Sequence, residues 1–359
     1  MAPSLNEVIF FSLFLLFIFL MLALDLGVFS KHAHKPKFKE ALIWTGVWVT
    51  ISLLFYGFLN HFGNILHGLD SAEAVAAKVS EYHHPIKLLE GISDEVAIGL
   101  YNNNLALEYL TGYLIEYSLS VDNVFVIILI FLSFNVKQQY YKKVLFWGIL
   151  GAVVMRFIFI FAASALLHYF EWLFVVFGAL LILLGAKMGY DFIFHRHKTT
   201  IDTKHHPVVR FASRWFSVTR EDHGEKFWVR RQGKIVLTPL FVVLLIIEFS
   251  DVLFAVDSVP AVFSVTKDPY IVFFSNIFAI LGLRSLFFLV MNVMNRFETL
   301  KVGLAVLLAF VGVKMILNHF QLMALTTRDS LLIILGILAA SILASVVLNF
   351  FRKKTTKPD

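Results

Sequence analysis

The sequence contains no cysteine among its 359 residues, and only 16% of its residues are charged. The absence of cysteine excludes disulfide bonds, thiolate metal sites and thiol catalysis. Soluble domains have about 25% charged residues, so the low fraction argues against a soluble protein. The patterns GxxxxGK[ST], HExxH, GxSxG and GxGD are also missing. No ATP-driven pump, metalloprotease, serine hydrolase or intramembrane aspartyl protease is therefore indicated, and we expect no enzymatic activity.

Long apolar segments dominate the chain. Hydrophobic residues make up 59% of it, and the mean hydropathy is +0.79. A helix needs about 20 apolar residues to cross the roughly 30 Å of hydrocarbon in a bilayer. Nine stretches come close to or exceed that length, near residues 7–28, 41–60, 112–134, 144–167, 172–192, 236–263, 271–294, 301–319 and 330–350. The sequence predicts an all-α polytopic membrane protein with about nine transmembrane helices.

The distribution of Lys and Arg predicts the topology. The first apolar segment has no basic residues before it, and the cluster Lys31, Lys35, Lys37 and Lys39 follows it. This pattern favours a retained helix with an external N-terminus over a cleaved signal peptide. Of 31 basic residues, 23 then fall in predicted cytoplasmic segments. We expect a multi-pass protein of the plasma (inner) membrane with a cytoplasmic C-terminus. These loops explain the net charge of +6 without a nucleic-acid partner.

The predicted spans and loops divide the chain into six parts. They are two N-terminal transmembrane helices (1–60), an extracytoplasmic loop (61–111), a first transmembrane repeat (112–192), a basic cytoplasmic loop (193–235), a second repeat (236–319), and a C-terminal transmembrane helix with a basic cytoplasmic tail (320–359). The two large loops contain the histidines 61, 67, 83, 84, 195, 197, 205 and 206. Their spacing is not typical of a zinc site, and we expect both loops to be solvated.

Two acidic stretches within apolar segments match one another. EYSLSVDNVFV begins at Glu116 and DVLFAVDSVPA at Asp251, so that a shift of 135 residues superimposes two carboxylates in each. A carboxylate at the centre of a membrane helix costs roughly 2.5–3.5 kcal/mol. Matched arginines (156 and 284) and matched Gly-x-Lys patterns (185–187 and 312–314) follow in the same order. The third to fifth spans therefore resemble the sixth to eighth, and a repeat of three spans must be inverted in the membrane.

The acidic stretches predict a cation site. The expected ligands are Asp25, Glu116, Asp122, Asn123, Glu248, Asp251, Asp257 and Ser258. Residues six apart on a helix point about 120° apart and lie about 9 Å apart along the axis, so neither stretch holds an ion alone as a straight helix. We expect Asp122 and Asp257 to face each other near the midplane, and Pro260 to interrupt its helix. Oxygen ligands suit Mg²⁺, Ca²⁺ or Mn²⁺.

An alternative role for the acids is ion pairing with the basic residues of the spans, Arg156, Lys187, Arg284 and Lys314. Lys187 and Lys314 lie near span ends, where a lysine can reach the interface. Six acids, Asp25 included, exceed four bases. The remaining negative charge suits a divalent cation.

The motifs resemble those of the TerC/Alx family of integral membrane proteins. The matching segments are EYLTGYLIEYSLSVDNVF from Glu108, EFSDVLFAVDSVPA from Glu248 and LALDLGVF from Leu22. The family is named for tellurite resistance, and its members are associated with manganese export. The resemblance implies that the acidic residues and Asn123 form a metal pathway, with Mn²⁺ as transported substrate and no tightly bound cofactor. The residues by themselves lead only to a divalent-cation transporter.

Two other functions remain open at this point. One is oxyanion (tellurite) resistance, in which Arg156 and Arg284 would bind the substrate. The other is an accessory membrane scaffold for metal loading or for assembly of exported proteins, with the loop 61–111 as docking surface. The coupling ion stays open. So does the choice between a monomer, a homo-oligomer and a complex with a membrane protein partner in the lipid bilayer.

Overall fold

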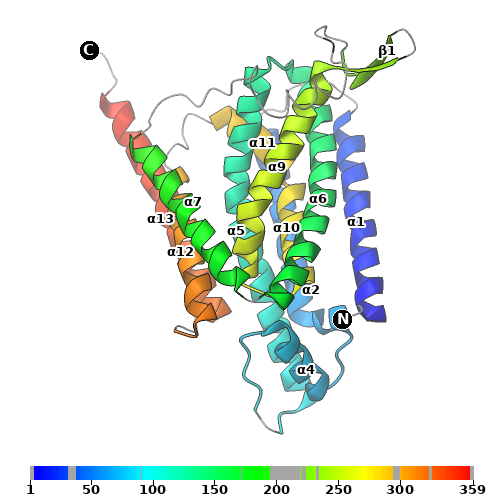
Figure 1. Ribbon diagram of the computed structural model, residues 1–359, viewed down its shortest axis with the longest axis vertical. Coiled ribbons are helices and arrows are strands. Elements are labelled where there is room, and N and C mark those ends of the chain that lie inside the picture. Colours follow the sequence, from blue (N-terminus) through cyan, green and yellow to red (C-terminus); the bar gives the residue numbers. More distant parts are fainter. Residues whose placement is uncertain are drawn as a thin grey trace.

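The structure is a computed structural model that describes residues 4–30, 38–89, 91–170, 172–194, 219, 224–231, 234–293, 300–322 and 326–355. Helices make up most of it (Figure 1). They are α1 (Leu5–Ser30), α2 (Phe38–Phe62), α3 (Asn64–His67), α4 (Ala72–Tyr82), α5 (Asp94–Ser133), η1 (Gln138–Tyr140), α6 (Tyr141–Tyr169), α7 (Leu173–Phe194), α9 (Pro239–Phe263), α10 (Pro269–Leu281), α11 (Leu283–Val293), α12 (Leu300–His319) and α13 (Thr327–Thr355). The strands β1 (Trp228–Arg231) and β2 (Lys234–Leu237) pair antiparallel, with Trp228 opposite Leu237.

Eight of the described helices are long and apolar enough to cross a membrane. The pair α10 and α11 makes a ninth span if the two helices, bent by 45°, count as one. This agrees with the predicted all-α polytopic fold of about nine spans. The N-terminus lies at the end of the molecule that carries α4, and the C-terminus lies towards the opposite end, where β1 is found (Figure 1). We call these the α4 end and the hairpin end.

Side-chain hydrogen bonds cap the N-termini of several helices, at residues that favour helix starts. Ser4 and Glu7 form a capping box, in which each backbone N–H donates to the other's side chain, at 2.8 and 3.2 Å. The Thr238 hydroxyl accepts from the N–H of Phe241 at the start of α9. Asp268 caps α10 in the same way, and a proline follows each of these two caps.

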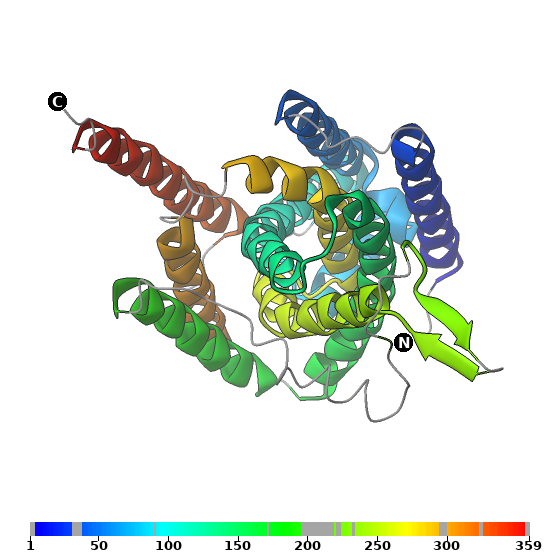
Figure 2. The same ribbon diagram turned by 90° about the horizontal axis from the view of Figure 1, so that it is seen from above.

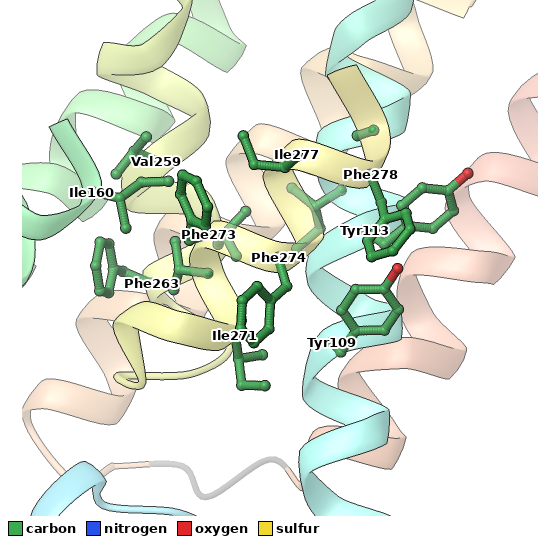
Figure 3. Packing of buried hydrophobic residues seen from close by; sticks show 14 of the residues in the cluster. Tyr109, Tyr113, Ile160, Val259, Phe263, Ile271, Phe273, Phe274, Ile277 and Phe278 are labelled. Atoms are coloured by element: carbon green, nitrogen blue, oxygen red, sulfur yellow. The ribbon is translucent and has the colours of Figure 1, made fainter. Parts of the chain in front are cut away.

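A buried helix lies at the middle of the fold. Seen from above, α5, α6, α9 and α10 form a central group, with α1 and α2 on one side and α7, α12 and α13 on the other (Figure 2). All thirteen residues of α10 are buried, as expected for a helix surrounded by other helices. Its Phe278 packs against Tyr109 of α5, with the ring centroids 5.9 Å apart (Figure 3).

The outer helices expose apolar side chains. Leu54 of α2, Leu183 of α7 and Leu343 of α13 are each more than 60% exposed. Large apolar side chains are exposed on many of the described helices, which is far more than the scattered few of a soluble monomer. They suit a surface in contact with lipid.

The predicted loop 61–111 is largely helical. It contains α3, α4 and the first turns of α5, which begins at Asp94 and not near residue 112. In this part of α5, Asn102 donates to the carbonyl of His61 at 3.2 Å and to the Asn64 side chain at 3.3 Å. Tertiary hydrogen bonds therefore stabilise a helical segment that hydropathy alone does not reveal.

The predicted helix break at Pro260 is wrong. Helix α9 stays regular through Pro260 and ends at Phe263. Only one backbone hydrogen bond is lost to a proline this close to the helix end, and the neighbouring Val259 and Ala261 are buried by packing. The break lies at Gly282 instead, between α10 and α11. Glycine has low helix propensity, so this position bends more readily than its neighbours.

Helices α7 and α12 pack through a reciprocal glycine contact. A Cβ atom on Gly178 would lie 2.9 Å from the carbonyl oxygen of Gly312, and one on Gly312 would lie 2.5 Å from that of Gly178. Further along, a Cβ on Gly185 would lie 2.7 Å from the carbonyl oxygen of Ala305. The later residue of α7 meets the earlier residue of α12, so the two helices run antiparallel.

Candidate functional site

Arg156 of α6 lies at the centre of a buried polar cluster. It is completely buried and donates to the carboxylate of Glu116 on α5. It also donates to Ser258 Oγ at 2.9 Å and, through Nη2 and Nε, to Asp251 at 3.4 and 3.5 Å, both on α9. Its fourth partner is Asn276 Oδ1 of α10. One guanidinium therefore joins the four helices of the central group.

The predicted ion pairing of the acids is confirmed for two of them. Glu116 and Asp251, which match in the two acidic stretches, both pair with Arg156. Their side chains are 0% and 13% exposed. Desolvating these charges is costly, and the arginine compensates for part of that cost by its charge and its fixed set of donors.

The α5 face next to Arg156 carries polar atoms that have no partner among the described residues. They are Glu116 Oε2, Ser120 Oγ and Asn123 Nδ2, all buried. Positions 116, 120 and 123 follow the spacing i, i+4 and i+7, and therefore share one face of the helix. Buried polar groups are normally hydrogen-bonded. This face thus holds hydrogen-bonding capacity that no described residue uses.

Glu248 belongs to the same region of α9 and lies against α6. A Cβ atom on Gly151 would lie 2.1 Å from Glu248 Oε1. The glycine therefore makes room for the carboxylate between the two helices. Glu248 and Asp251 are three residues apart and point to the same side of α9.

Asn276 is the one member of the cluster that the motif analysis did not single out. Its Nδ2 donates to the carbonyl of Val272 at 3.1 Å, which orients Oδ1 towards Arg156. The signal in the sequence was an amide inside the apolar stretch 271–294. A polar residue in such a segment is a candidate functional residue by itself.

The structure brings together Glu116, Asp251 and Ser258 of the eight predicted ligands, with Glu248 and Asn123 on the same two helices. Asp122, Asp257 and Asp25 lie in α5, α9 and α1, but their side chains fall outside the described part of the structure. That Asp122 and Asp257 face each other stays a prediction. Across the described residues, no three His, Asp or Glu side chains gather closely enough to hold a metal ion.

A second buried polar cluster at the α4 end corrects the expectation of a solvated loop. His67 and His84 are buried at 5% and 6% exposure. His67 Nδ1 lies 2.6 Å from Glu7 Oε1, and Nε2 lies 3.0 Å from Asp268 Oδ2. Burial alone would lower the pKa of His67, but Asp268 and Glu7 raise it above its ordinary value. A protonated ring, with both nitrogens donating, satisfies both carboxylates.

Residues 101–357 match the model of the integral membrane protein TerC family. The chain belongs to the TerC family. A "putative membrane-bound redox modulator Alx" of Escherichia coli (strain K12) is 39% identical over 93% of both chains. An uncharacterized membrane protein of Myxococcus xanthus is 41% identical over 96% of this chain and 94% of its own.

A third relative is an uncharacterized membrane protein of Rickettsia bellii, 36% identical over 93% of this chain and 96% of its own length. No solved structure shows a significant match. The matched TerC segment contains Glu116, Arg156, Asp251 and Asn276, so the whole Arg156 cluster lies within the family domain.

Proposed function

We propose that this TerC family protein is a secondary transporter that exports a divalent metal cation, with Mn²⁺ as the substrate that the family resemblance indicates. The observation that carries the proposal is the pair of matched carboxylates between two spans, Glu116, which is fully buried, and Asp251, which is 13% exposed. Buried acids in a membrane segment are expensive and typically mark an ion pathway. The surplus of intramembrane acids over bases fits a substrate with two positive charges.

Arg156 acts as the internal counter-charge of the two acids. Mn²⁺ is a hard cation and prefers carboxylate, amide and hydroxyl oxygens. Glu116, Ser120 and Asn123 offer such oxygens on one face of α5, and Glu116 Oε2 and Ser120 Oγ have no hydrogen-bond partner among the described residues. We propose that an entering cation competes with Arg156 for Glu116. The cation then gains oxygen ligands, and the arginine keeps Ser258 and Asn276.

The helix arrangement supports transport at the repeat interface. Many secondary transporters have inverted repeats and discontinuous helices near the substrate. Here α10 and α11 form a discontinuous span, and Asn276 of the cluster belongs to α10. In the predicted repeat, position 178 of α7 corresponds to position 305 of α12, and position 185 corresponds to position 312. Exchanging the two helices therefore converts the contact Gly178–Gly312 into the contact Gly185–Ala305. A twofold relation between the repeats would produce this reciprocity. On this view the α4 end faces outward and the protein has no enzymatic activity.

The Arg156 cluster gives less support to the alternatives. An oxyanion bound by Arg156 would have to displace two carboxylates, a hydroxyl and an amide oxygen that already accept from it. The relatives named for redox modulation raise a further possibility, but this chain has no cysteine for thiol redox chemistry. A scaffold role at the α4 end is compatible with transport and is tested separately, by deleting the segment of α4.

Flux of Mn²⁺ into or out of proteoliposomes tests the proposal. Glu116→Gln and Asp251→Asn keep the side-chain shape but remove the charge, and we expect each to lower the initial rate at least about tenfold. Glu95→Gln, an exposed glutamate of the same helix α5, is the matched control and should transport normally. Asp122→Ala and Asp257→Ala test the two aspartates that are predicted to face each other. Wild-type rates in all four site variants would refute a carboxylate pathway.

A further inference from the structure

We propose that a cavity at the α4 end binds a protonated oxyanion of the phosphate class. This Lys314 cavity has a volume of about 360 Å³. Its walls come from the end of α4, from α5, from the start of α7, from the α9–α10 connection, from α12 and from the start of α13. Glu108 of its wall lies eight residues before Glu116, about 12 Å away along α5. The site is separate from the Arg156 cluster and does not depend on cation transport.

Lys314 is the central residue of the proposed site. We expected this lysine to reach the interface, but it is only 6% exposed and lines the cavity. It makes no hydrogen bond or ion pair with any residue that the structure describes. A buried ammonium without a partner is strongly unfavourable. An anion in the cavity would supply the missing counter-charge.

Glu108 is the carboxylate that lines the cavity together with Lys314, but its charge is already compensated. Its Oε1 accepts from His84 Nδ1 at 2.9 Å and from Asn104 Nδ2 at 2.7 Å. Burial would lower the pKa of His84, yet the Glu108 carboxylate raises it above its ordinary value. The raised pKa of His84 favours a positive charge beside the Glu108 carboxylate, so that the hydrogen-bonded pair is close to neutral. Lys314 then remains the uncompensated charge of the cavity.

The second carboxylate oxygen of Glu108 favours an anion that carries an O–H group. Oε2 is buried and has no hydrogen-bond partner among the described residues. A fully deprotonated anion such as sulfate would be repelled by this oxygen. Hydrogen phosphate and a phosphate monoester carry negative charge for Lys314 and also an O–H group that can donate to Glu108. The combination of one ammonium and one unpartnered carboxylate oxygen therefore favours a protonated phosphate over sulfate.

Other groups of the cavity fit the same ligand. Lys267 also lines it, with its Nζ 4.9 Å from the centre of the Phe174 ring. Thr266 and Asn318 add neutral polar groups. The volume exceeds that of an inorganic phosphate and leaves room for the ester group of a monoester or for water.

Calorimetric titration of the purified full-length protein with inorganic phosphate tests the site. We expect phosphate to bind, and Lys314→Met to weaken its binding at least about tenfold. Lys314→Arg should retain it. Lys187→Met is the matched control, because Lys187 occupies the equivalent position of the other repeat and is exposed. Absence of phosphate binding to the wild-type protein, or equal binding by Lys314→Met, would overturn the proposal. A melting curve confirms that each variant is folded.

Sulfate provides an independent test that does not rely on Lys314. The wild-type protein should bind sulfate at least about tenfold more weakly than phosphate. In Glu108→Gln the amide can donate to a deprotonated oxygen, so sulfate affinity should rise and the discrimination should shrink. Equal affinities in the wild-type protein, or an unchanged ratio in Glu108→Gln, would overturn the role assigned to Glu108.

A lipid could supply the same chemistry, because phosphatidic acid carries a phosphate monoester. The phosphate titration is therefore repeated in nanodiscs of phosphatidylcholine, with and without phosphatidic acid. If the lipid headgroup is the occupant, it should compete and weaken phosphate binding in the wild-type protein but not in Lys314→Met. If free phosphate is the occupant, the lipid should have no effect. Either result supports a phosphate-class site and identifies its source.

Discussion

Arg156 of α6 and Glu116 of α5 form an ion pair in which the side chains are only 1% and 0% exposed. Removing both charges from water is expensive, and a buried pair often contributes little net stability. Breaking such a pair is nevertheless severe, because the remaining charge stays buried. The guanidinium also donates to groups of α9 and α10. The pair is therefore better explained by a role in placing carboxylates within the membrane than by stability alone.

Replacing the arginine should destabilise the protein strongly. We expect Arg156→Met to lower the free energy of unfolding by about 3–5 kcal/mol, because Glu116 and Asp251 lose their counter-charge. Adding Glu116→Gln should restore part of that loss, since two coupled changes are not additive. Thermal or denaturant unfolding in detergent measures both effects. Arg328→Met, at an exposed position, serves as control. Strict additivity would contradict direct coupling of the pair.

The glycine contact between α7 and α12 should tolerate no added methyl group. In Gly312→Ala the new Cβ would lie 2.5 Å from a backbone oxygen that cannot rotate away. We expect the helices to separate and stability to fall by about 1–3 kcal/mol. Gly336→Ala in α13 has no atom within 4 Å of the new Cβ and is the matched control. It should stabilise the helix by about 0.5–1 kcal/mol. Equal melting temperatures of both variants would disprove the tight packing.

Substitution of Gly151 tests Glu248 without changing the acid itself. A Cβ at this position would overlap the Glu248 carboxylate, which must then turn away from α6. If Glu248 is part of the metal pathway, Gly151→Ala should raise the half-saturating Mn²⁺ concentration about tenfold, because one charged ligand is displaced. Gly46→Ala has open space around its Cβ and should behave as wild type. Unchanged Mn²⁺ dependence in Gly151→Ala would place Glu248 outside the pathway.

The buried His67 makes stability depend on pH. Asp268 and Glu7 raise its pKa in the folded protein, so its stabilising contribution is complete below the unfolded pKa near 6.5. That contribution is lost as the pH rises through the folded pKa. His84 is shifted in the same direction by Glu108. We expect the melting temperature to fall as pH rises above neutral, and the fall to be smaller in His67→Gln.

The exposed His61 provides the control for this pH dependence. His61→Gln should show the same fall in melting temperature as the wild-type protein. The double variant His67→Gln/His84→Gln should show the smallest fall. A pH profile that is the same in all of these proteins would exclude the two buried histidines as its source.

The apolar runs predicted the spans well because crossing hydrocarbon imposes a length and a composition that are local properties. The capping box of Ser4 and Glu7 is local as well. The helical start at Asp94 escaped prediction, since Asn102 obtains its partners from residues about 40 positions away. The break expected at Pro260 lies instead at Gly282, where the packing around α10 permits a bend. Local helix propensity does not show which of two such residues, Pro260 or Gly282, will interrupt a helix.

The sequence alone determined that this is a polytopic membrane protein of the TerC family type, and that Glu116 and Asp251 are a matched pair of costly acids. Hydropathy is sufficient for the spans and spacing for the matched acids, and the motifs carry the family resemblance. Only the tertiary structure decided that Arg156 is the shared partner of those acids, that Asn276 joins them, and that Lys314 lines a cavity. These relationships depend on which helix faces meet. Contacts across helices are set by packing of the whole chain, and short-range patterns carry no record of them.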